Sequence, residues 1–315
     1  MFIVKNKNIF LWISAILVVA SIIPIALFGL NLGTDFKGGT IVEIAYGQDA
    51  PSKDEVMSRV VSAGVESSSI QTAGTNGYLI KMKPISEDQR VVLISSLSGA
   101  TMATSSASST ATSAQVAGFQ VKRFSTIGPS VGAELAEKGM IALGGVALLI
   151  IIFIAFAFRQ VSRPVSSWKY GLMAVVALIH DVTIPTGVFA YLGHFYGTEI
   201  DALFLTALLT ILALSVSDTI VVFDRIRENL RNKISNSFEE TVGISLDETI
   251  TRSLITSMTV ILVLLALLFF GSPSTRDFAL VLAIGMFFGT YSSIFLASPL
   301  LVTAYNRQET KRLKK

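Results

Sequence analysis

Long runs without a charged residue dominate the hydrophobic pattern of this chain. Five of them contain no Asp, Glu, Lys or Arg, namely Ile9–Thr34, Met140–Phe158, Ala202–Ser217, Ser253–Thr275 and Phe278–Asn306. A sixth run, Tyr170–Thr198, is interrupted only by Asp181 and two histidines. Because about 20 apolar residues cross a bilayer as a helix, the pattern predicts six membrane spans. We place them near residues 9–30, 139–158, 171–192, 202–223, 253–271 and 278–303.

The distribution of Lys and Arg predicts how these spans are oriented. Fifteen basic residues lie in the N-terminus, the second-to-third loop, the fourth-to-fifth loop and the tail at 306–315. The two short loops on the other side hold only Arg276. The positive-inside rule then places both termini in the cytoplasm and the long segment 31–138 outside. The first apolar run is too long for a signal-peptide core and is expected to remain as a span.

Composition agrees with a membrane protein and narrows the possible chemistry. Hydrophobic residues make up 51% of the chain and charged residues 15%, against about 25% charged in ordinary globular domains. The absence of cysteine excludes disulfides, thiol catalysis and iron–sulfur clusters. The net charge is +3. The excess basic residues lie in the loops predicted to be cytoplasmic, so the charge does not indicate a nucleic-acid partner. We expect neither a cofactor nor a metal ion.

The segment between the first two spans shows the pattern of a small α+β domain. Strands are predicted at Thr40–Tyr46, Ser68–Thr72, Tyr78–Lys83 and Phe119–Phe124, and helices at Pro51–Ala63 and Ser86–Leu97. Ser86 and Gln89 are spaced as a capping box at the start of the second helix. The order βαββαβ is that of the ferredoxin-like motif, a common fold that says little about function.

Two other segments interrupt this domain pattern. In 95–117, 19 of 23 residues are Ser, Thr, Ala or Gly, which leaves little apolar surface to bury. We interpret it as a flexible insertion or a frayed helix extension, without a function. Before the first strand, Asp35 and the pair Gly38 and Gly39 form either a turn at the membrane exit or a hinge between span and domain.

The fourth span contains the first candidate for chemistry, Asp218. A carboxylate at the centre of a membrane helix costs roughly 2.5–3.5 kcal/mol on insertion scales, so such residues usually face a partner or a water-filled path. Helical spacing places Ser215 and Arg225 on the same face as Asp218 and turns Asp224 elsewhere. Protonation or a cation such as Arg252 could neutralise the carboxylate.

Further polar residues occur in the other spans. In the fifth span, Arg252, Thr256 and Thr259 form one stripe, which either hydrogen-bonds to neighbouring helices or meets Asp218 and lines a proton path. In the third span, His180 and Asp181 either fix helix packing or relay protons. In the sixth, Gly285 and Gly289 form a G-x-x-x-G pattern, interpreted as close helix packing.

Five motifs, in order along the chain, are similar to those of the SecF family. They are G-x-D-F-x-G-G-T at 33–40, I-G-P-S-x-G at 127–132, H-D-V at 180–182, S-D-T-I-V-V-F-D-R-I-R-E-N at 217–229 and T-R-S-L-I-T-S at 251–257. The resemblance covers nearly the whole chain. It implies six spans with one ferredoxin-like extracytoplasmic domain, in the RND transporter superfamily and the bacterial cytoplasmic membrane. Ser217 stands where the family usually has Asn. Its hydroxyl can still form a hydrogen bond, as the Asn side chain would.

The resemblance also implies a function and partners. SecF proteins pair with SecD, associate with the SecYEG translocon and YajC, and use the proton gradient to draw preproteins outward after the ATP-driven stage. The charged intramembrane residues of the family correspond to Asp218 and Arg252, with another carboxylate supplied by SecD. The chain is therefore expected to be a proton-driven subunit of protein export and not an enzyme.

Two other functions remain as alternatives. A self-contained RND-type exporter of a small molecule or lipid is expected to carry two six-span halves, whereas this chain has one. An intramembrane aspartyl protease could use Asp181 and Asp218, but such proteases carry G-x-G-D around one carboxylate. This chain has Ser-Val-Ser-Asp at 215–218.

Overall fold

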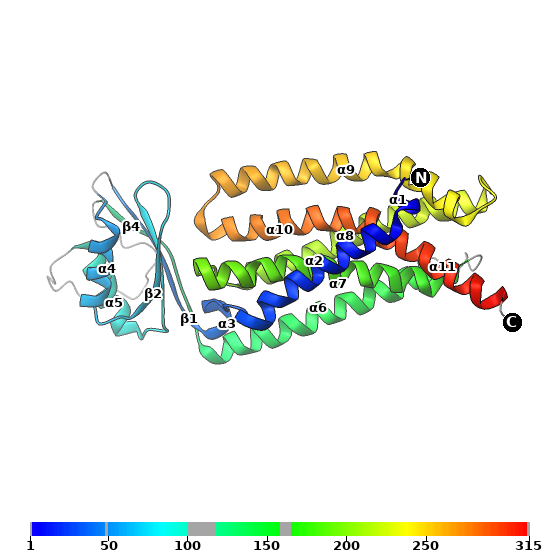
Figure 1. Ribbon diagram of the computed structural model, residues 1–315. Helices are drawn as coiled ribbons and strands as arrows, with labels where there is room; N and C mark the ends of the chain where they lie inside the picture. Colours follow the sequence, from blue (N-terminus) through cyan, green and yellow to red (C-terminus); the bar gives the residue numbers. More distant parts are fainter. Residues whose placement is uncertain (1, 48–49, 100–117, 158–164, 314–315) are drawn as a thin grey trace. The chain divides into compact units, whose positions relative to one another are not determined.

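The computed structural model describes residues 2–47, 50–99, 118–157 and 165–313. These residues form two compact units (Figure 1). The helical unit comprises Met1–Asn31, Met140–Phe270 and Asp277–Lys315. The sheet unit comprises Leu32–Gly139 and Gly271–Arg276.

The described residues of the sheet unit form four antiparallel strands and two helices that pack against them. Its elements follow the short helix α3 (Thr34–Lys37) and are β1 (Gly39–Tyr46), α4 (Lys53–Ser62), β2 (Ser67–Thr72), β3 (Gly77–Met82), α5 (Glu87–Ser98) and β4 (Phe119–Ile127). The strand order is β2-β3-β1-β4. The four predicted strands are present, and β4 extends to Ile127 because Ile127 pairs with Gly39 at the start of β1.

Local sequence explains where the two helices of this unit begin. The Ser52 hydroxyl caps α4 by accepting from the Glu55 amide, and the predicted capping box of Ser86 and Gln89 is confirmed at α5. Each cap satisfies an amide that the first helical turn leaves without a partner. The insertion predicted at 95–117 begins inside α5, and its residues 100–117 lie outside the described part of the chain.

Alternating side chains of the central strand build the core of the sheet unit. Val42 and Ile44 of β1 are fully buried together with Val56 of α4 and Leu93 of α5. Tyr46 at the end of β1 donates its hydroxyl to the Leu97 carbonyl (2.9 Å), and burial raises the pKa of this tyrosine. The hydroxyl therefore stays protonated at neutral pH and anchors the last turn of α5.

Among the described residues, six helices are long and apolar enough to cross a membrane, as predicted. They are α2 (Lys7–Phe28), α6 (Pro129–Ala157), α7 (Ser167–Tyr196), α8 (Ala202–Arg231), α9 (Phe238–Phe270) and the continuous rod of α10 (Pro273–Ser292), η1 (Ser293–Ala297) and α11 (Ser298–Leu313). A short helix, α1 (Phe2–Lys5), precedes them. The helix α8 continues past the predicted end of its span at residue 223, and α9 begins before the predicted start of its span at residue 253. Charged residues continue the helical pattern in both extensions.

The interior of the helical unit is formed by α7, α8 and the last rod, whereas α2, α6 and α9 present wide apolar faces outward. In Figure 1, α2 runs beside α7, and α8 lies between α7 and α9. Large apolar side chains on the outer helices are exposed, such as Trp12 (70%), Leu149 (65%) and Phe269 (68%). Such faces suit contact with lipid or with another membrane helix.

Glycine permits the close approach of α2 and α7. A Cβ atom added to Gly187 would lie 2.5 Å from the Ser21 Cβ and 2.6 Å from the Ser21 Cα. Because the Ser21 backbone cannot rotate away as a side-chain end can, the two helices would have to separate.

Gly187→Ala is therefore expected to lower the thermal midpoint of the purified protein, with a cost of about 1–3 kcal/mol for overpacking. Differential scanning fluorimetry in detergent measures this effect. Gly144→Ala is the matched control, because no atom lies within 4 Å of a Cβ at that position of α6. Equal midpoints for the two variants would contradict the packing of α2 against α7.

Candidate functional site

Asp218 lies half-buried on α8 and points toward α9. One carboxylate oxygen, Oδ1, accepts a hydrogen bond from the Ser253 hydroxyl of α9. The other oxygen, Oδ2, is buried and has no hydrogen-bond partner among the described residues. A buried polar atom without a partner costs about 1–3 kcal/mol. Asp218 is therefore held on one side and available to a proton, a water molecule or a further side chain on the other.

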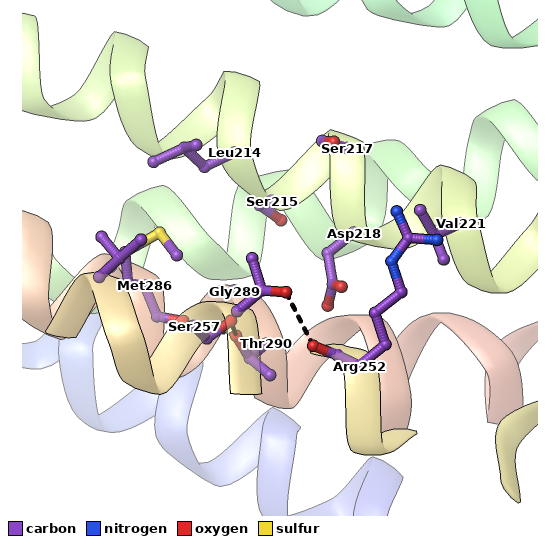
Figure 2. A pocket seen from close by; sticks show the side chains of 13 residues that line it. Leu214, Ser215, Ser217, Asp218, Val221, Arg252, Ser257, Met286, Gly289 and Thr290 are labelled. Carbon is purple, nitrogen blue, oxygen red and sulfur yellow. Dashed lines mark hydrogen bonds between the residues drawn. The ribbon is translucent and has the colours of Figure 1, made fainter. Parts of the chain in front are cut away.

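A cavity of about 140 Å³ adjoins this carboxylate (Figure 2). It lies between α8, α9 and α10, and its walls include both apolar and polar side chains. The polar ones are Ser215, Ser217, Asp218, Arg252, Thr256, Ser257 and Thr290. A space of this size holds several water molecules, which need polar partners such as these hydroxyls.

Arg252 lines the same cavity, and Figure 2 shows its side chain extending from α9 beside Asp218. In the described part of the chain, the two residues form no ion pair within 4 Å, and neither pairs with another charge. The Arg252 side chain is exposed, so its guanidinium group is free to approach or leave the carboxylate. The structure thus brings together the two predicted charged residues without direct contact.

The predicted stripe on α9 is only partly located at this site. Thr256 lines the cavity, but Thr259 is exposed and does not. Both hydroxyls donate to carbonyls of their own helix, Thr256 to Arg252 O and Thr259 to Ile255 O, each at 2.8 Å. The interpretation of Arg252, Thr256 and Thr259 as one stripe that meets Asp218 is therefore wrong for Thr259.

A second polar stripe on α9, which the sequence analysis missed, packs against the interior. Its buried members are spaced four residues apart: Thr241, Ser245, Thr249, Ser253 and Ser257. Ser253 bonds to Asp218 and Ser257 accepts from Thr290 of α10. The signal in the sequence was the unbroken i, i+4 repeat of small hydroxyl residues, a pattern typical of close contacts between membrane helices.

Asp181 on α7 is fully buried and accepts hydrogen bonds from two other helices. Its Oδ2 accepts from Ser215 of α8 (2.5 Å) and from Ser292 at the end of α10 (2.8 Å). Its Oδ1 lies 2.9 Å from His180 Nδ1. We call Asp181, His180, Ser215 and Ser292 the Asp181 cluster. These contacts agree with the packing alternative for His180 and Asp181, and the proton-relay alternative stays a prediction.

His180 is 2% exposed and lies among aromatic rings of α10. Its ring stacks at 6.0 Å on Tyr291 and meets Phe288 edge-on at 6.3 Å. Its second nitrogen, Nε2, has no hydrogen-bond partner among the described residues. The cluster thus contains one satisfied carboxylate and one orphaned ring nitrogen.

The sixth-span glycines bring α10 against α8 at the level of this cluster. A Cβ on Gly285 would overlap the Ile211 side chain, and a Cβ on Gly289 would lie 3.2 Å from the Ser215 Cβ. This agrees with the packing interpretation of the G-x-x-x-G pattern. The helix then changes to the π turn η1, whose Ser293 hydroxyl lies 2.9 Å from the hydroxyl of Thr219, the residue after Asp218.

The far end of α8 is tied to α9 by charged and amide groups. Arg225 Nε donates to Glu248 (2.6 Å), and the buried Asn229 donates to Glu248 (2.7 Å) and to Ser245 (3.0 Å). Arg225, predicted to share the Asp218 face, is thus engaged with acidic residues instead. Asp224 is exposed, as its predicted direction requires.

In the sheet unit, both glycines at the start of β1 make close contacts, Gly38 with Pro129 and Gly39 with the backbone of Met82 in β3. Gly38 has a positive φ of 80°, and a Cβ there would lie 2.8 Å from Pro129 Cα. A Cβ on Gly39 would lie 2.8 Å from the Met82 carbonyl oxygen. Both glycines are thus required by close contacts, next to Asp35 in α3. Motion about this motif stays a prediction.

Among the described residues, no three His, Asp or Glu side chains come together in a way that could hold a metal ion.

The fold and the site together define a multi-pass membrane protein with an intramembrane carboxylate beside a polar cavity. Comparison with known families makes this class specific. The model of the C-terminal region of the SecD/SecF protein export membrane proteins matches residues 107–307, and that of the SecD/SecF GG motif matches residues 25–50. The chain belongs to the SecD/SecF family.

Individual relatives agree with this assignment. The chain is 40% identical to the protein translocase subunit SecF of Thermobaculum terrenum over 97% of this chain and 94% of that protein. It is 37% identical to SecF of Anaerolinea thermophila, with coverages of 95% and 92%. The crystal structure of SecDF from Thermus thermophilus matches with a TM-score of 0.75 and 30% identity. This chain is 96% covered but spans only 38% of that longer chain.

The close approach of Ser215 and Gly289 gives a direct test of the site geometry in a chain without natural cysteines. The double variant Ser215→Cys, Gly289→Cys is expected to form a disulfide on mild oxidation, because the two Cβ atoms would lie 3.2 Å apart and a small shift brings them to the separation of about 3.5–4.5 Å that suits this bond. Mass spectrometry of unreduced peptides detects the cross-link. The pair Ala213→Cys, Gly289→Cys serves as the control, since Ala213 is exposed on α8 and does not line the cavity. Equal cross-linking of the two pairs would contradict the structure.

Proposed function

We propose that this chain is a proton-coupled SecF subunit, which acts with SecD to promote preprotein translocation after the ATP-driven stage. The observation that carries the proposal is Asp218, a carboxylate with one unpartnered oxygen beside a polar cavity within apolar helices. A carboxylate retained at such a place without a fixed cation is suited to bind and release a proton. Arg252 on the neighbouring helix supplies a charge that can replace the proton.

The energy available from one proton is sufficient for a conformational step. Its passage down a potential of about 100 mV yields about 2.3 kcal/mol. A difference of about 1.4 kcal/mol changes an equilibrium tenfold, so a single proton biases a two-state rearrangement by more than tenfold. Asp218 reaches α9 through Ser253, so a change in its charge acts first on the contact between α8 and α9.

SecD is the proposed partner, because this chain matches only 38% of the SecDF chain of Thermus thermophilus, which leaves room in that chain for a SecD part. A second carboxylate from SecD would complete the path that begins at Asp218. The SecYEG translocon, YajC and the preprotein are the further proposed partners. The exposed apolar faces of α2, α6 and α9 would contact lipid or these membrane partners.

The proposed location is the bacterial cytoplasmic membrane, with both termini in the cytoplasm. Residues 31–138 would form an extracytoplasmic domain and residues 139–305 the five later spans, with 1–30 holding the first span and 306–315 a basic tail. The strand order β2-β3-β1-β4 and the alternation of its helices support a ferredoxin-like fold for the outer domain. Asp35, Gly38 and Gly39 are proposed as its hinge.

Asp218→Asn is expected to abolish the proton-dependent part of preprotein translocation. The amide has the same shape as the carboxyl group but cannot bind and release a proton. Translocation into inverted membrane vesicles, measured with and without an uncoupler, separates this part from the ATP-driven part. Association with SecD, measured by co-purification, should be unchanged.

Asp224→Asn is the matched control, because this carboxylate lies six residues further along α8 but is exposed. It should retain full uncoupler-sensitive translocation. If Asp218→Asn vesicles kept the same uncoupler sensitivity as those of the control, the proposed mechanism would be excluded.

A further inference from the structure

From the geometry of the Asp181 cluster, we infer that Asp181 and His180 form a second proton-binding site in this chain, connected to the Asp218 cavity through Ser215. The inference deepens the proposed function and rests on it in treating Asp218 as the coupling carboxylate. The chain would then have two proton-binding carboxylates: Asp218, which lines the cavity, and Asp181, which the Ser215 hydroxyl separates from the cavity.

The first argument is the position of Ser215. Its side chain lines the cavity that Asp218 adjoins, and its hydroxyl donates to Asp181 Oδ2 at 2.5 Å. One hydroxyl therefore separates the carboxylate of α7 from the space beside the carboxylate of α8. The cavity has room for water in contact with this hydroxyl.

This connection permits a balanced proton transfer. A water chain in the cavity delivers a proton to Ser215 Oγ as the hydroxyl hydrogen of Ser215 passes to Asp181 Oδ2. Ser215 remains a neutral hydroxyl, and the carboxylate becomes a carboxylic acid. The reverse hop returns the proton to the cavity, so no other reactant is required.

The second argument is the orphaned nitrogen of His180. One proton shared between His180 Nδ1 and Asp181 Oδ1 can reside on either atom. In both cases Nε2 has no partner, although the side chain is 2% exposed. A pair that served packing alone would avoid the cost of about 1–3 kcal/mol for a buried polar atom without a partner. A pair that accepts a further proton needs such an open position.

The charged and titratable groups around the pair come from several helices. Besides His180 and Asp181 on α7, they are Asp218 on α8, Arg252 on α9 and Tyr291 on α10. From α2, Ser14 lies 3.4 Å from the Tyr291 hydroxyl, and the single charge of that helix is Lys7 at its first residue. Among the residues that line the cavity, Arg252 is the cation, and it is exposed. A proton on either carboxylate reduces the repulsion between the two.

The test is infrared difference spectroscopy of the complex with SecD in lipid, recorded between acidic and alkaline pH. A carboxyl group that takes up a proton gains a carboxylic-acid carbonyl band, and replacement by Asn removes the band of that residue. We expect one band to disappear in Asp181→Asn and another in Asp218→Asn. If Asp181→Asn left every carboxylic-acid band in place, the inference would be overturned.

Ser215→Ala keeps the Asp181 carboxylate and provides a second measurement if Asp181→Asn does not assemble. Loss of the donated hydrogen bond should shift the Asp181 band and slow its appearance after a pH jump. Thr206→Ala is the control, since that hydroxyl is exposed on the same helix and bonds only to its own helix at Ala202 O. Unchanged band position and rate in Ser215→Ala would overturn the connection through Ser215.

The spectra test the second proton-binding site and the translocation assay tests the proposed function, so either proposal can be disproved without the other. An Asp181 band together with normal uncoupler sensitivity in Asp218→Asn would disprove the proposed function and leave proton binding at Asp181 intact. Loss of uncoupler sensitivity in Asp218→Asn, with no band assigned to Asp181, would disprove only the second site.

Discussion

The hydrogen bonds to Asp181 connect three helices at the centre of the helical unit, and the surrounding packing depends on them. A membrane interior offers no water to replace a lost hydrogen bond. Ser215 of α8 and Ser292 of α10 must therefore stay within reach of the α7 carboxylate, which fixes the depth of α8 and α10 relative to α7. This close packing explains the glycines at 285 and 289. Only a helix without side chains at these positions can approach α8 closely enough.

The same arrangement separates the roles of the two carboxylates. The oxygens of Asp181 are engaged with two hydroxyls and a histidine, whereas one oxygen of Asp218 has no hydrogen-bond partner in the described part of the chain. Ser215 lies one helical turn before Asp218 and donates to Asp181, so the turn of α8 that carries Asp218 is fixed from the side of α7. On the proposed function, a change of charge at Asp218 would act on the side of α9 and the cavity, where its Oδ1 accepts from Ser253.

Local patterns in the sequence predicted the six spans, the four strands and the capping box, since each depends on residues close together in the chain. The contacts of Asp181 depend on which faces of three separate helices meet, and no local pattern specifies this. On α9 there are two polar faces, about 100° apart at 100° per residue. The sequence alone favoured the face with Arg252 and Thr259, but the face with Ser253 and Ser257 packs inward.

The position of α9 explains why this choice of face matters for coupling. Asn229 and Arg225 bind Glu248, which fixes the first half of α9 to α8. Beyond Ser257, large apolar side chains of α9 are exposed, such as Val263 (65%) and Phe270 (90%). The contact of Asp218 with Ser253 lies between the tied half and the exposed half. On the proposed function, protonation of Asp218 would remove the charge that Ser253 supports at this boundary, and the half of α9 beyond it, which is largely exposed among the described residues, would be the part free to shift.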